Sequence, residues 1–381
     1  MPCKKKINPT VLEVNLNAIL DNFNYFRSLL KPNTKIICMV KANGYGIGAY
    51  RLSRILQNNG ADVLAVALVD EGIYLRKKGI HLPIIVMNTE KYSLNKIFQY
   101  NLYPCIYSQN ILNATILETK KQGILHYPIH LKIDTGMHRF GFNPKDISII
   151  AKILKSQNNV FVQSVFSHLV ATDDPLLDDF TNQQIKLFIR LSMQLKQFLS
   201  YPFQRHILNS AGIERFPNAQ FDMVRLGIGL YGTSVCASYA TEKENSYSIK
   251  STTVLKTRIV QIREIKKGET VGYNCGGRLN RDSRIASLSI GYADGLNRHL
   301  GNHCGQVFID GHLCPIIGNI CMDSCMIDIT DITNHRVVEG DEVEIFGKHI
   351  TINSLAEKLQ TIPYEILTSI SQRVKRVYVK K

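Results

Sequence analysis

Short apolar segments alternate with segments of helical periodicity along the N-terminal part of the chain, and this alternation restricts the possible fold most strongly. Eight strand–helix units follow one another over about 200 residues. The predicted strands are residues 35–40, 61–68, 83–87, 102–107, 127–133, 160–166, 206–209 and 223–225. Such alternation predicts an α/β fold with a parallel sheet, and eight units of this length predict a closed (β/α)8 barrel.

The pattern changes after Gly232, where a polar segment, residues 234–250, has the composition of a linker. Short strands separated by Gly and Asp turns then predict a mostly antiparallel β domain, followed by a helix at about 352–359 and a basic tail. Its predicted strands are residues 253–262, 285–290, 306–309, 316–317, 326–329 and 342–346. We therefore expect a barrel domain over 1–240 and a β domain over 241–381, with residues 1–16 as candidates to pair with the β domain.

Composition excludes several classes of protein. No apolar run in the 381 residues approaches the roughly 18 needed to span a bilayer, and no apolar signal core follows the basic N-terminus, so we expect a cytoplasmic protein. The nine cysteines are dispersed without a CxxC pair, which predicts reduced thiols and no metal site. The net charge of +15 is spread along the chain without a basic block, so nucleic acid is not an expected partner.

The segment IICMVKANGYGIG places Lys41 where a buried strand gives way to glycines. Burial disfavours an ammonium group and lowers its pKa, and a neutral amine is what carbonyl condensation requires. The glycines allow a close approach of the backbone to a ligand. From this segment alone, a solvated lysine at the end of a strand is the more common interpretation. Evidence for a cofactor lysine must therefore come from other parts of the chain.

Reactive side chains also follow other predicted barrel strands. His168 follows the sixth strand, Asn209 and Ser210 the seventh, and Arg225 the eighth. Catalytic groups of such barrels lie at the carboxyl ends of the strands. A lysine for an aldehyde, a hydroxyl and glycine cup for a phosphate, and an arginine for a ring nitrogen together indicate pyridoxal phosphate.

An ordered set of motifs runs through nearly the whole chain: VKANGYG, HLKIDTGMHRFG, SHL, NSAG, MVRLGIGLYG, GYN, SIGYADG, GNICMD, GDEVEIFG and PYEIL. With these motifs the chain resembles the alanine racemases, pyridoxal-phosphate enzymes built from a barrel and a β domain. Each motif is weak by itself, and the ordered set is specific. The resemblance implies an amino-acid racemase that interconverts L- and D-alanine and supplies D-alanine for peptidoglycan synthesis.

The resemblance assigns most of the cofactor site to the barrel. It implies that pyridoxal phosphate is contacted by Lys41, Tyr45, Arg139, His168, Asn209, Ser210, Arg225, Gly227, Ile228 and Tyr364. Lys41 would bind the cofactor covalently and act as the base on one face of the substrate. Arg225 would face the pyridine nitrogen, and because arginine cannot readily give up a proton, the ring would be a weaker electron sink that favours simple reprotonation.

The resemblance places the second base, Tyr273, in the β domain, where it would act on the opposite face of the substrate. It further implies substrate contacts from Arg139, Tyr292, Met322 and Asp323, with Asp294 beside the entrance. Lys132 occupies the position of a lysine that family members carry in carboxylated form. In the family the β-domain residues come from the other subunit, which implies a homodimer with shared sites.

Three alternatives remain at this stage. A decarboxylase of the same fold would need an HxGS-like segment and an acidic residue opposite the pyridine nitrogen, where this chain has SHLVATDD and Arg225. A non-catalytic cofactor-binding protein would usually lack the β domain. The chain departs from the common family residues at Ile47, Leu226, Asn319 and Ser324. Because Asn319 and Ser324 flank the predicted substrate loop, a racemase of broader specificity for small amino acids stays open.

Overall fold

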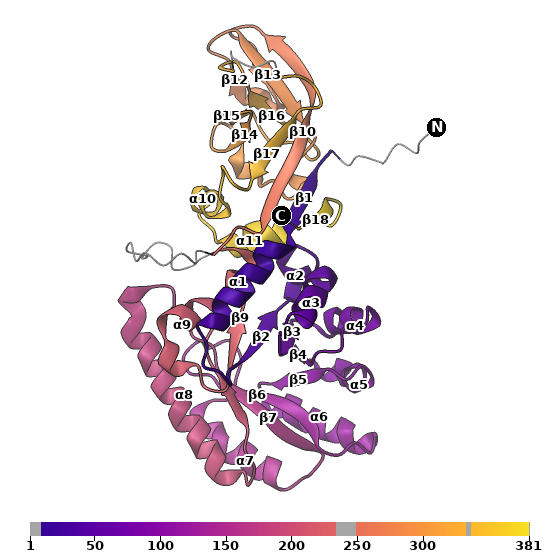
Figure 1. Cartoon of the computed structure of the whole chain (residues 1–381), viewed down its shortest axis with the longest axis vertical. Helices are drawn as coiled ribbons and strands as arrows, with labels where there is room; N and C mark the ends of the chain where they lie inside the picture. The colour runs from indigo at the N-terminus through magenta and orange to yellow at the C-terminus, as the bar shows by residue number, and fades with distance from the viewer. Residues whose placement is uncertain (1–8, 234–248, 333–336, 381) are drawn as a thin grey trace.

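The computed structural model describes residues 9–233, 249–332 and 337–380, which form two bodies stacked along the long axis of the molecule (Figure 1). The lower body in Figure 1 is a barrel of strands and helices, and the upper body consists mainly of strands. The predicted boundary between residues 240 and 241 lies outside the described residues and stays a prediction.

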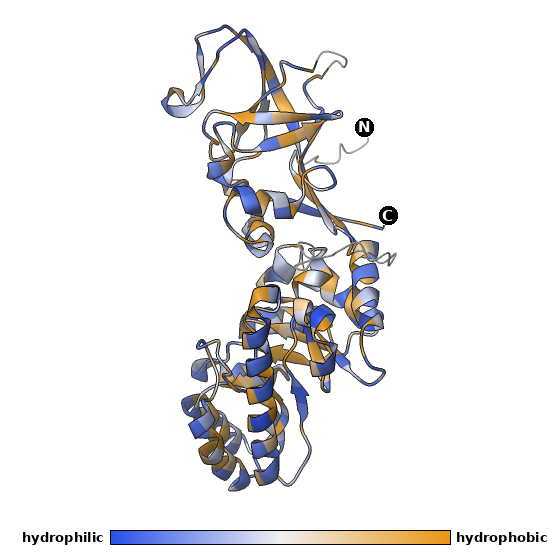
Figure 2. Cartoon of the chain, turned by 90° about the vertical axis from the view of Figure 1, so that its left-hand side faces the viewer, coloured by the Kyte–Doolittle hydropathy of each residue, from blue (hydrophilic) through white to orange (hydrophobic). Residues whose placement is uncertain are grey.

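Eight parallel strands form the barrel, which closes because β2 (Lys35–Met39) pairs with both β3 (Val63–Val66) and β9 (Met223–Leu226). The intervening strands are β4 (Ile84–Val86), β5 (Tyr103–Ile106), β6 (Tyr127–Lys132), β7 (Val160–Phe166) and β8 (Gln204–His206). Continuous apolar runs such as VLAV in β3 are typical of parallel strands that are buried on both faces. Figure 2 shows these strands as largely hydrophobic. The predicted (β/α)8 barrel is confirmed.

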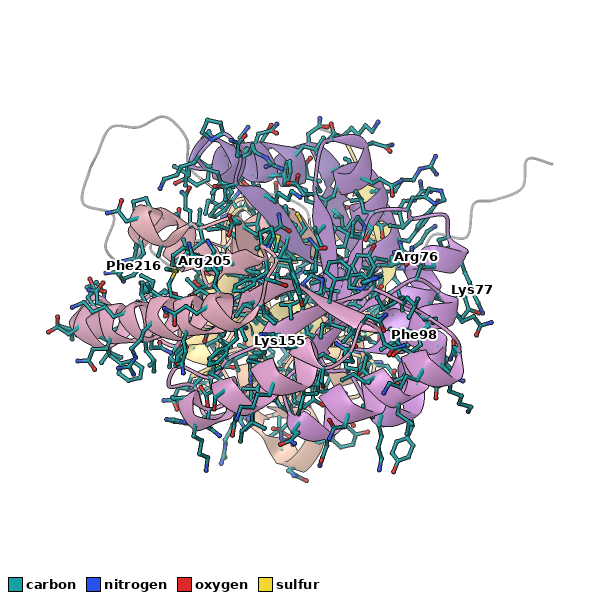
Figure 3. All side chains as sticks on the ribbon, turned by 90° about the horizontal axis from the view of Figure 1, so that it is seen from below. Arg76, Lys77, Phe98, Lys155, Arg205 and Phe216 are labelled. Atoms are coloured by element: carbon teal, nitrogen blue, oxygen red, sulfur yellow. The ribbon has the colours of Figure 1, made fainter. Side chains whose placement is uncertain are left out.

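Helices surround the barrel strands, as the view from below in Figure 3 shows. They are α1 (Leu16–Ser28), α3 (Ala49–Asn58), α4 (Val69–Lys77), α5 (Leu94–Gln99), α6 (Gln109–Lys121), α7 (Ile147–Lys155), α8 (Asp178–Phe198) and α9 (Ser210–Arg215). In α8 the buried residues Phe188, Leu191 and Leu195 recur at helical spacing, so one stripe of this helix packs inward. None of the helices in the described part of the chain is long and apolar enough to cross a bilayer.

The upper body is the predicted β domain, and its antiparallel character is confirmed. Its strand order is β13-β16-β15-β14-β17-β10-β1-β18, and β10 also pairs with β13. The bounds are β1 (Val11–Asn15), β10 (Thr253–Ile265), β13 (Ser283–Leu288), β14 (Gln306–Ile309), β15 (His312–Ile317), β16 (Cys325–Asp328), β17 (Glu342–Phe346) and β18 (Lys375–Val379). β1 pairs antiparallel with β10 and parallel with β18, so the first strand of the chain lies in the sheet of the C-terminal domain.

Two predicted elements were wrong. The seventh barrel strand, predicted at 206–209, is β8 at Gln204–His206, because the Asn209 side chain instead accepts a hydrogen bond from the Gly212 amide (2.9 Å) and begins α9. The basic tail after the helix α10 (Ile352–Lys358) contains the helix α11 (Pro363–Ser369) and β18. Proline is favoured in the first turn of a helix, as at Pro363, and all five residues of β18 pair with β1.

Candidate active site

A cavity of about 640 Å³ opens at the carboxyl ends of the barrel strands, where barrels of this kind hold their catalytic groups. All residues predicted to contact the cofactor line this cavity: Lys41, Tyr45, Arg139, His168, Asn209, Ser210, Arg225, Gly227, Ile228 and Tyr364. Lys132 lines it too. These residues come from distant parts of the chain, and the closure of the barrel brings them together.

Lys41 follows the last residues of β2 and begins α2 (Lys41–Tyr45), a turn with unusual backbone geometry. The φ angles of Ala42, Asn43, Gly44 and Tyr45 are 52°, 52°, 61° and 50°. Left-handed backbone costs about 1–2 kcal/mol for each residue other than glycine, so the surrounding contacts must hold this turn. Burial lowers the pKa of the Lys41 amine and Arg139 lowers it further, while Glu71 raises it. The net shift enlarges the neutral fraction, which is the nucleophilic form of the amine.

Hydroxyl and amide groups form a cradle at one end of the cavity. The Ser210 hydroxyl oxygen accepts hydrogen bonds from the amides of Gly227 (2.9 Å) and Gly229 (3.2 Å). A Cβ atom at Gly227 would lie 3.3 Å from the Tyr45 hydroxyl and 3.7 Å from the Ser210 hydroxyl, so a side chain at this position would fill the cradle. The ring of Tyr364 lies 5.9 Å from that of Tyr45. Because the two amides donate to the Ser210 oxygen, the Ser210 hydroxyl proton is left to donate elsewhere, and together with the nearby Tyr45 hydroxyl it is a donor that fits a phosphate group.

Arg225 is buried on β9, and its guanidinium donates to two histidines. It donates to Nδ1 of His206 (2.7 Å) and to Nδ1 of His168 (3.1 Å). Because a guanidinium only donates, both rings must accept through Nδ1 and carry their proton on Nε2. Burial, followed by the Arg225 charge, lowers the pKa of each histidine, so both are neutral at neutral pH. Burial also lowers the pKa of Arg225, to about 10, which leaves its charge intact at that pH.

Lys132 and Arg139 lie on another side of the cavity. Burial lowers the pKa of Lys132 to about 8. Its amine lies 5.4 Å from the ring centre of Phe140, the residue after Arg139. The loop that carries Arg139 is shaped by Asp134, whose carboxylate accepts hydrogen bonds from the amides of Gly136, Met137 and His138.

Within the described residues of one chain, the predicted β-domain residues Tyr273, Tyr292, Met322 and Asp323 do not line this cavity. The exposed fractions of Tyr273, Tyr292 and Met322 are 69%, 44% and 54%. Tyr273 lines a separate open hollow of about 420 Å³ on the β domain. One chain therefore brings Lys41 together with the cofactor residues and leaves Tyr273 on a different surface.

Hydrogen bonds fix the turn that presents Tyr273. This turn, η7 (Tyr273–Cys275), contains left-handed residues, with φ angles of 57° at Asn274 and 52° at Cys275. The Asn319 side-chain nitrogen donates to the Tyr273 carbonyl (2.9 Å), and its side-chain oxygen accepts from the side-chain nitrogen of Asn302 (3.1 Å). Asn319, one of the departures from the common family residues, thus takes part in holding the Tyr273 turn.

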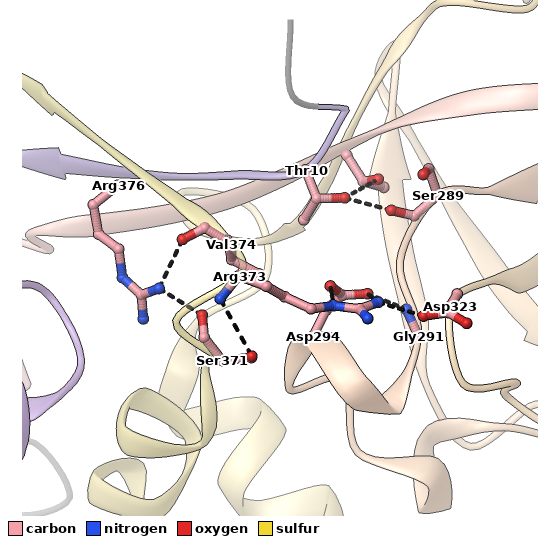
Figure 4. A network of polar contacts seen from close by, with 10 residues as sticks. Thr10, Ser289, Gly291, Asp294, Asp323, Ser371, Arg373, Val374 and Arg376 are labelled. Atoms are coloured by element: carbon pink, nitrogen blue, oxygen red, sulfur yellow. Dashed lines mark hydrogen bonds and ion pairs between the residues drawn. The ribbon is translucent and has the colours of Figure 1, made fainter. Parts of the chain in front are cut away.

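A polar network joins Asp294, in the turn that follows Tyr292, to Asp323, next to Met322 (Figure 4). Arg373 donates to Asp294 (2.6 Å) and to Asp323 (2.5 Å), and Asp294 also accepts from the Gly291 amide (2.9 Å). Asp294, which was expected beside an entrance, is buried and serves to hold this turn. The Tyr292 amide donates to the Cys321 carbonyl (3.0 Å), so the turn and the loop form one unit.

Sequence reasoning missed two residues that support the cavity. His206 accepts a hydrogen bond from Arg225. Tyr231 stacks on Tyr45 with ring centres 4.3 Å apart, and its hydroxyl donates to the Met39 carbonyl (2.6 Å). His206 could have been suspected, because it is a histidine in a predicted buried strand. Tyr231 lies within the quoted motif MVRLGIGLYG, but nothing in that motif indicated a role for it, because its partners Met39 and Tyr45 lie far away in the sequence.

Comparisons with known proteins agree with this architecture. Residues 14–235 match the family described as "Alanine racemase, N-terminal domain", and residues 252–378 match "Alanine racemase, C-terminal domain". The chain is 38% identical over 383 residues to alanine racemase 1 of Clostridium acetobutylicum, which covers 99% of this chain and 97% of that protein. It is also 36% identical over 380 residues to an alanine racemase of Methanococcus maripaludis, a match that covers 98% of this chain and 99% of that protein.

Solved structures are similar over the same length. An alanine racemase of Clostridium difficile 630 superposes with a TM-score of 0.91 at 31% identity, covering 99% of this chain and 97% of that one. An alanine racemase of Bartonella henselae with covalently bound pyridoxal phosphate superposes with a TM-score of 0.88 at 29% identity, covering 98% of this chain and 100% of that one.

Proposed function

The chain belongs to the alanine racemase family, and from this premise we propose how its residues divide the work of inverting alanine. The protein is a pyridoxal-phosphate-dependent alanine racemase that interconverts L- and D-alanine. One observation carries the assignment of residues: the side chains and amides that would hold the cofactor all meet in one cavity of about 640 Å³, a volume typical of cofactor sites.

The residues of the cavity fit pyridoxal phosphate. The Ser210 and Tyr45 hydroxyls, with the backbone at Gly227 and Ile228, would hold the phosphate, and Arg225 would donate to the pyridine nitrogen. Lys41 is the amine that would hold the aldehyde carbon. When bound, the cofactor supplies an electron sink that stabilises negative charge at the α-carbon of the amino acid.

The protein must supply two acid–base groups, because inversion requires a proton to leave one face of the α-carbon and another to arrive on the opposite face. Lys41 is the group on the first face. Its amine has a pKa lowered by burial, which makes the neutral, proton-accepting form accessible nearer to neutral pH. The left-handed turn of α2 fixes the backbone from which this amine reaches into the cavity.

Tyr273 is the group on the second face, and we infer that it comes from a second copy of the chain. Its exposure in one chain, on a surface apart from the cavity of Lys41, supports a homodimer whose sites are shared between subunits. The proton on Nε2 of His168, assigned from its contact with Arg225, would be available to stabilise the Tyr273 phenolate. Tyr292, Met322 and Asp323 would reach the substrate from the same partner.

Arg139 would bind the substrate carboxylate, and Lys132 would position it. With a pKa of about 8, Lys132 has enough neutral amine near neutral pH to react with CO2. In that reaction the nitrogen forms a bond to carbon and loses one proton, which leaves a negatively charged carbamate. This negative charge beside Arg139 would hold the guanidinium in place.

The reaction places the enzyme in D-alanine supply. D-Alanine is the form used in peptidoglycan, so we propose that the protein provides it for the cell wall and acts in the cytoplasm. Serine or other small amino acids are candidates for slower substrates. If cells from which the gene is deleted grew without added D-alanine, this role would be contradicted.

The function is tested by incubation of the enzyme with L-alanine in heavy water. We expect optical activity to decay to zero while deuterium enters the α-position, because each inversion removes one proton and delivers another from a group that exchanges with solvent. Release of CO2 or transfer of the amino group would identify a decarboxylase or a transaminase instead. Parallel incubation with L-serine and with L-arginine measures the breadth of the substrate range.

A further inference from the structure

Glu71 links the turn of Lys41 to the neighbouring barrel strand. One carboxylate oxygen, Oε1, accepts a hydrogen bond from the Ala42 amide (2.5 Å). The other, Oε2, accepts from the amides of Ala67 (2.8 Å) and Leu68 (3.1 Å), just after β3. A single side chain therefore joins the carboxyl ends of β2 and β3 at the position of the cofactor lysine.

Only part of this arrangement is explained by the helix on which Glu71 lies. Glu71 is the third residue of α4, and a glutamate at this position commonly accepts from the amide of the capping residue, here Leu68. This capping hydrogen bond uses Oε2, so the capping motif does not account for the hydrogen bond that Oε1 accepts. The contact from Oε1 to Ala42 lies outside the capping motif and spans 29 positions of sequence.

The contact with Ala42 acts directly on Lys41 because of peptide geometry. The Ala42 N–H lies in the same rigid plane as the Lys41 carbonyl, so anchoring this amide fixes the ψ angle of Lys41. The residues that follow are left-handed from Ala42 to Tyr45, a conformation that needs support. The far end of the turn is held separately, since Arg376 donates to the Gly46 carbonyl (2.9 Å) and Tyr378 to the Ile47 carbonyl (2.9 Å).

We propose that Glu71 is a positioning residue for Lys41, which it holds by anchoring the Lys41–Ala42 peptide to the end of β3. The inference rests on the proposed role of Lys41. Charge adds to the geometry: the Glu71 carboxylate favours the ammonium form and opposes the lowering of the Lys41 pKa by burial. Glu71 thus holds the peptide from which the Lys41 side chain extends, and its charge limits how far burial and Arg139 lower the Lys41 pKa.

Glu71→Gln is the variant that isolates the link. Glutamine also serves as the capping partner at the third position of a helix, so its carbonyl oxygen can still accept from Ala67 and Leu68. Its NH2 group would then face the Ala42 N–H, donor against donor, and the link would break. Asp70→Asn is the matched control, because it removes the same charge one residue earlier from a side chain that is 86% exposed and lies 3.9 Å from Lys96.

Two measurements test the proposal. In the loaded enzyme, we expect Glu71→Gln to lower kcat about tenfold or more with KM for alanine nearly unchanged, since small misplacement of a reacting group is costly. In the full chain freed of cofactor, the rate of Lys41 acetylation by acetic anhydride, followed against pH by peptide mass spectrometry, should show its midpoint at lower pH in Glu71→Gln. Asp70→Asn should match wild type in both.

The outcomes separate the possible explanations. If Glu71→Gln and Asp70→Asn behave alike, or if the loss of kcat appears only together with a lowered unfolding temperature, the proposal is wrong. Lys41→Ala, measured in parallel, tests the premise on which it rests. If that variant keeps the visible absorbance of a cofactor bound to lysine, the assignment of Lys41 fails, and this result is distinct from any result at Glu71.

Discussion

The barrel and the β domain contribute unequally to the site. The barrel supplies every residue proposed to bind the cofactor except Tyr364 on α11, and buried contacts such as that between Arg225 and His206 hold these residues around one cavity. In the β domain, Tyr273, Tyr292 and Met322 are exposed, although the turns that carry them are fixed by Asn319 and Arg373. A rigid but uncovered surface is what a domain needs if it completes the site of another copy.

This difference implies a division of labour. The barrel would hold the cofactor and one base within a single chain, and the β domain would deliver the other base across a subunit boundary. Exposed apolar side chains gathered on one surface often mark an interface. Variants in the barrel and in the β domain test this division, because each should impair a different part of the reaction.

The largest effect is expected from Lys41→Ala in the barrel. We expect racemisation to fall by at least about 10³-fold, because the variant loses a base and the amine that holds the cofactor. The visible absorbance of the lysine-bound cofactor should disappear as well. Cofactor spectra like those of wild type would remove Lys41 from its proposed role.

Tyr273→Phe tests the other half of the site. We expect racemisation to fall roughly 10²- to 10⁴-fold, the usual contribution of an acid–base group. The two enantiomers are equal in energy, so the two directions must slow equally, and the informative measurement is exchange of the α-proton with solvent. One enantiomer should exchange far more slowly than the other, and equal small effects on both would argue against a two-base mechanism. The absorbance of the bound cofactor should remain, in contrast to Lys41→Ala.

Lys132→Ala should have an intermediate effect. We expect kcat/KM to fall about 10- to 100-fold through misplacement of Arg139, with the cofactor still bound. Removal of CO2 and bicarbonate from the buffer should lower the activity of wild type and leave that of the variant unchanged. Wild-type activity that does not respond to CO2 would contradict carboxylation of Lys132.

The smallest effect concerns stability and is confined to the barrel. Burial lowers the pKa of His130 to about 3 and also lowers those of His168 and His206, whereas an unfolded histidine titrates near about 6.5. Below about pH 6.5 the unfolded chain therefore binds more protons than the folded one, and the free energy of unfolding should decrease as the pH falls. The slope is at most about 1.4 kcal/mol per pH unit for each histidine. Urea unfolding at several pH values measures it.

The matched variants for this prediction come from the two halves of the molecule. His130→Gln should flatten the slope, because it removes a buried titrating group. His299→Gln, at an exposed histidine of the β domain, should leave the slope unchanged. A slope that is the same in all three proteins would show that the buried barrel histidines do not control acid stability.

Most of the barrel could be predicted from the sequence, because its parallel strands are nearly continuous apolar runs with clear boundaries. Lys41 and Arg225 were found for the same reason, since a charged residue next to such a run is conspicuous. The β8 strand was misplaced because it is short and polar at Gln204 and Arg205, so the apolar residues after it drew the prediction toward α9. The elements α11 and β18 were missed because their partners lie elsewhere in the chain: α11 packs against α10 and α2, and β18 pairs with β1.

The contacts that hold the site residues in place could not be predicted from the sequence. The left-handed turn after Lys41 depends on Glu71 and Arg376, which lie far from it in the chain. The histidine beneath Arg225 and the asparagine that holds the Tyr273 turn act through contacts that no local pattern encodes. Motif resemblance named the residues of the site, and only the fold shows which of them one chain brings together.

The most direct test of the shared site is a heterodimer of Lys41→Ala and Tyr273→Phe. The two variants, each expected to have strongly reduced activity when produced alone, are produced together with different tags and purified through both. If the two bases come from different subunits, one of the two sites contains both intact residues, and the heterodimer should recover about half of wild-type activity. If Lys41 and Tyr273 act within one chain, both sites are damaged, and the activity should not exceed that of the parent variants.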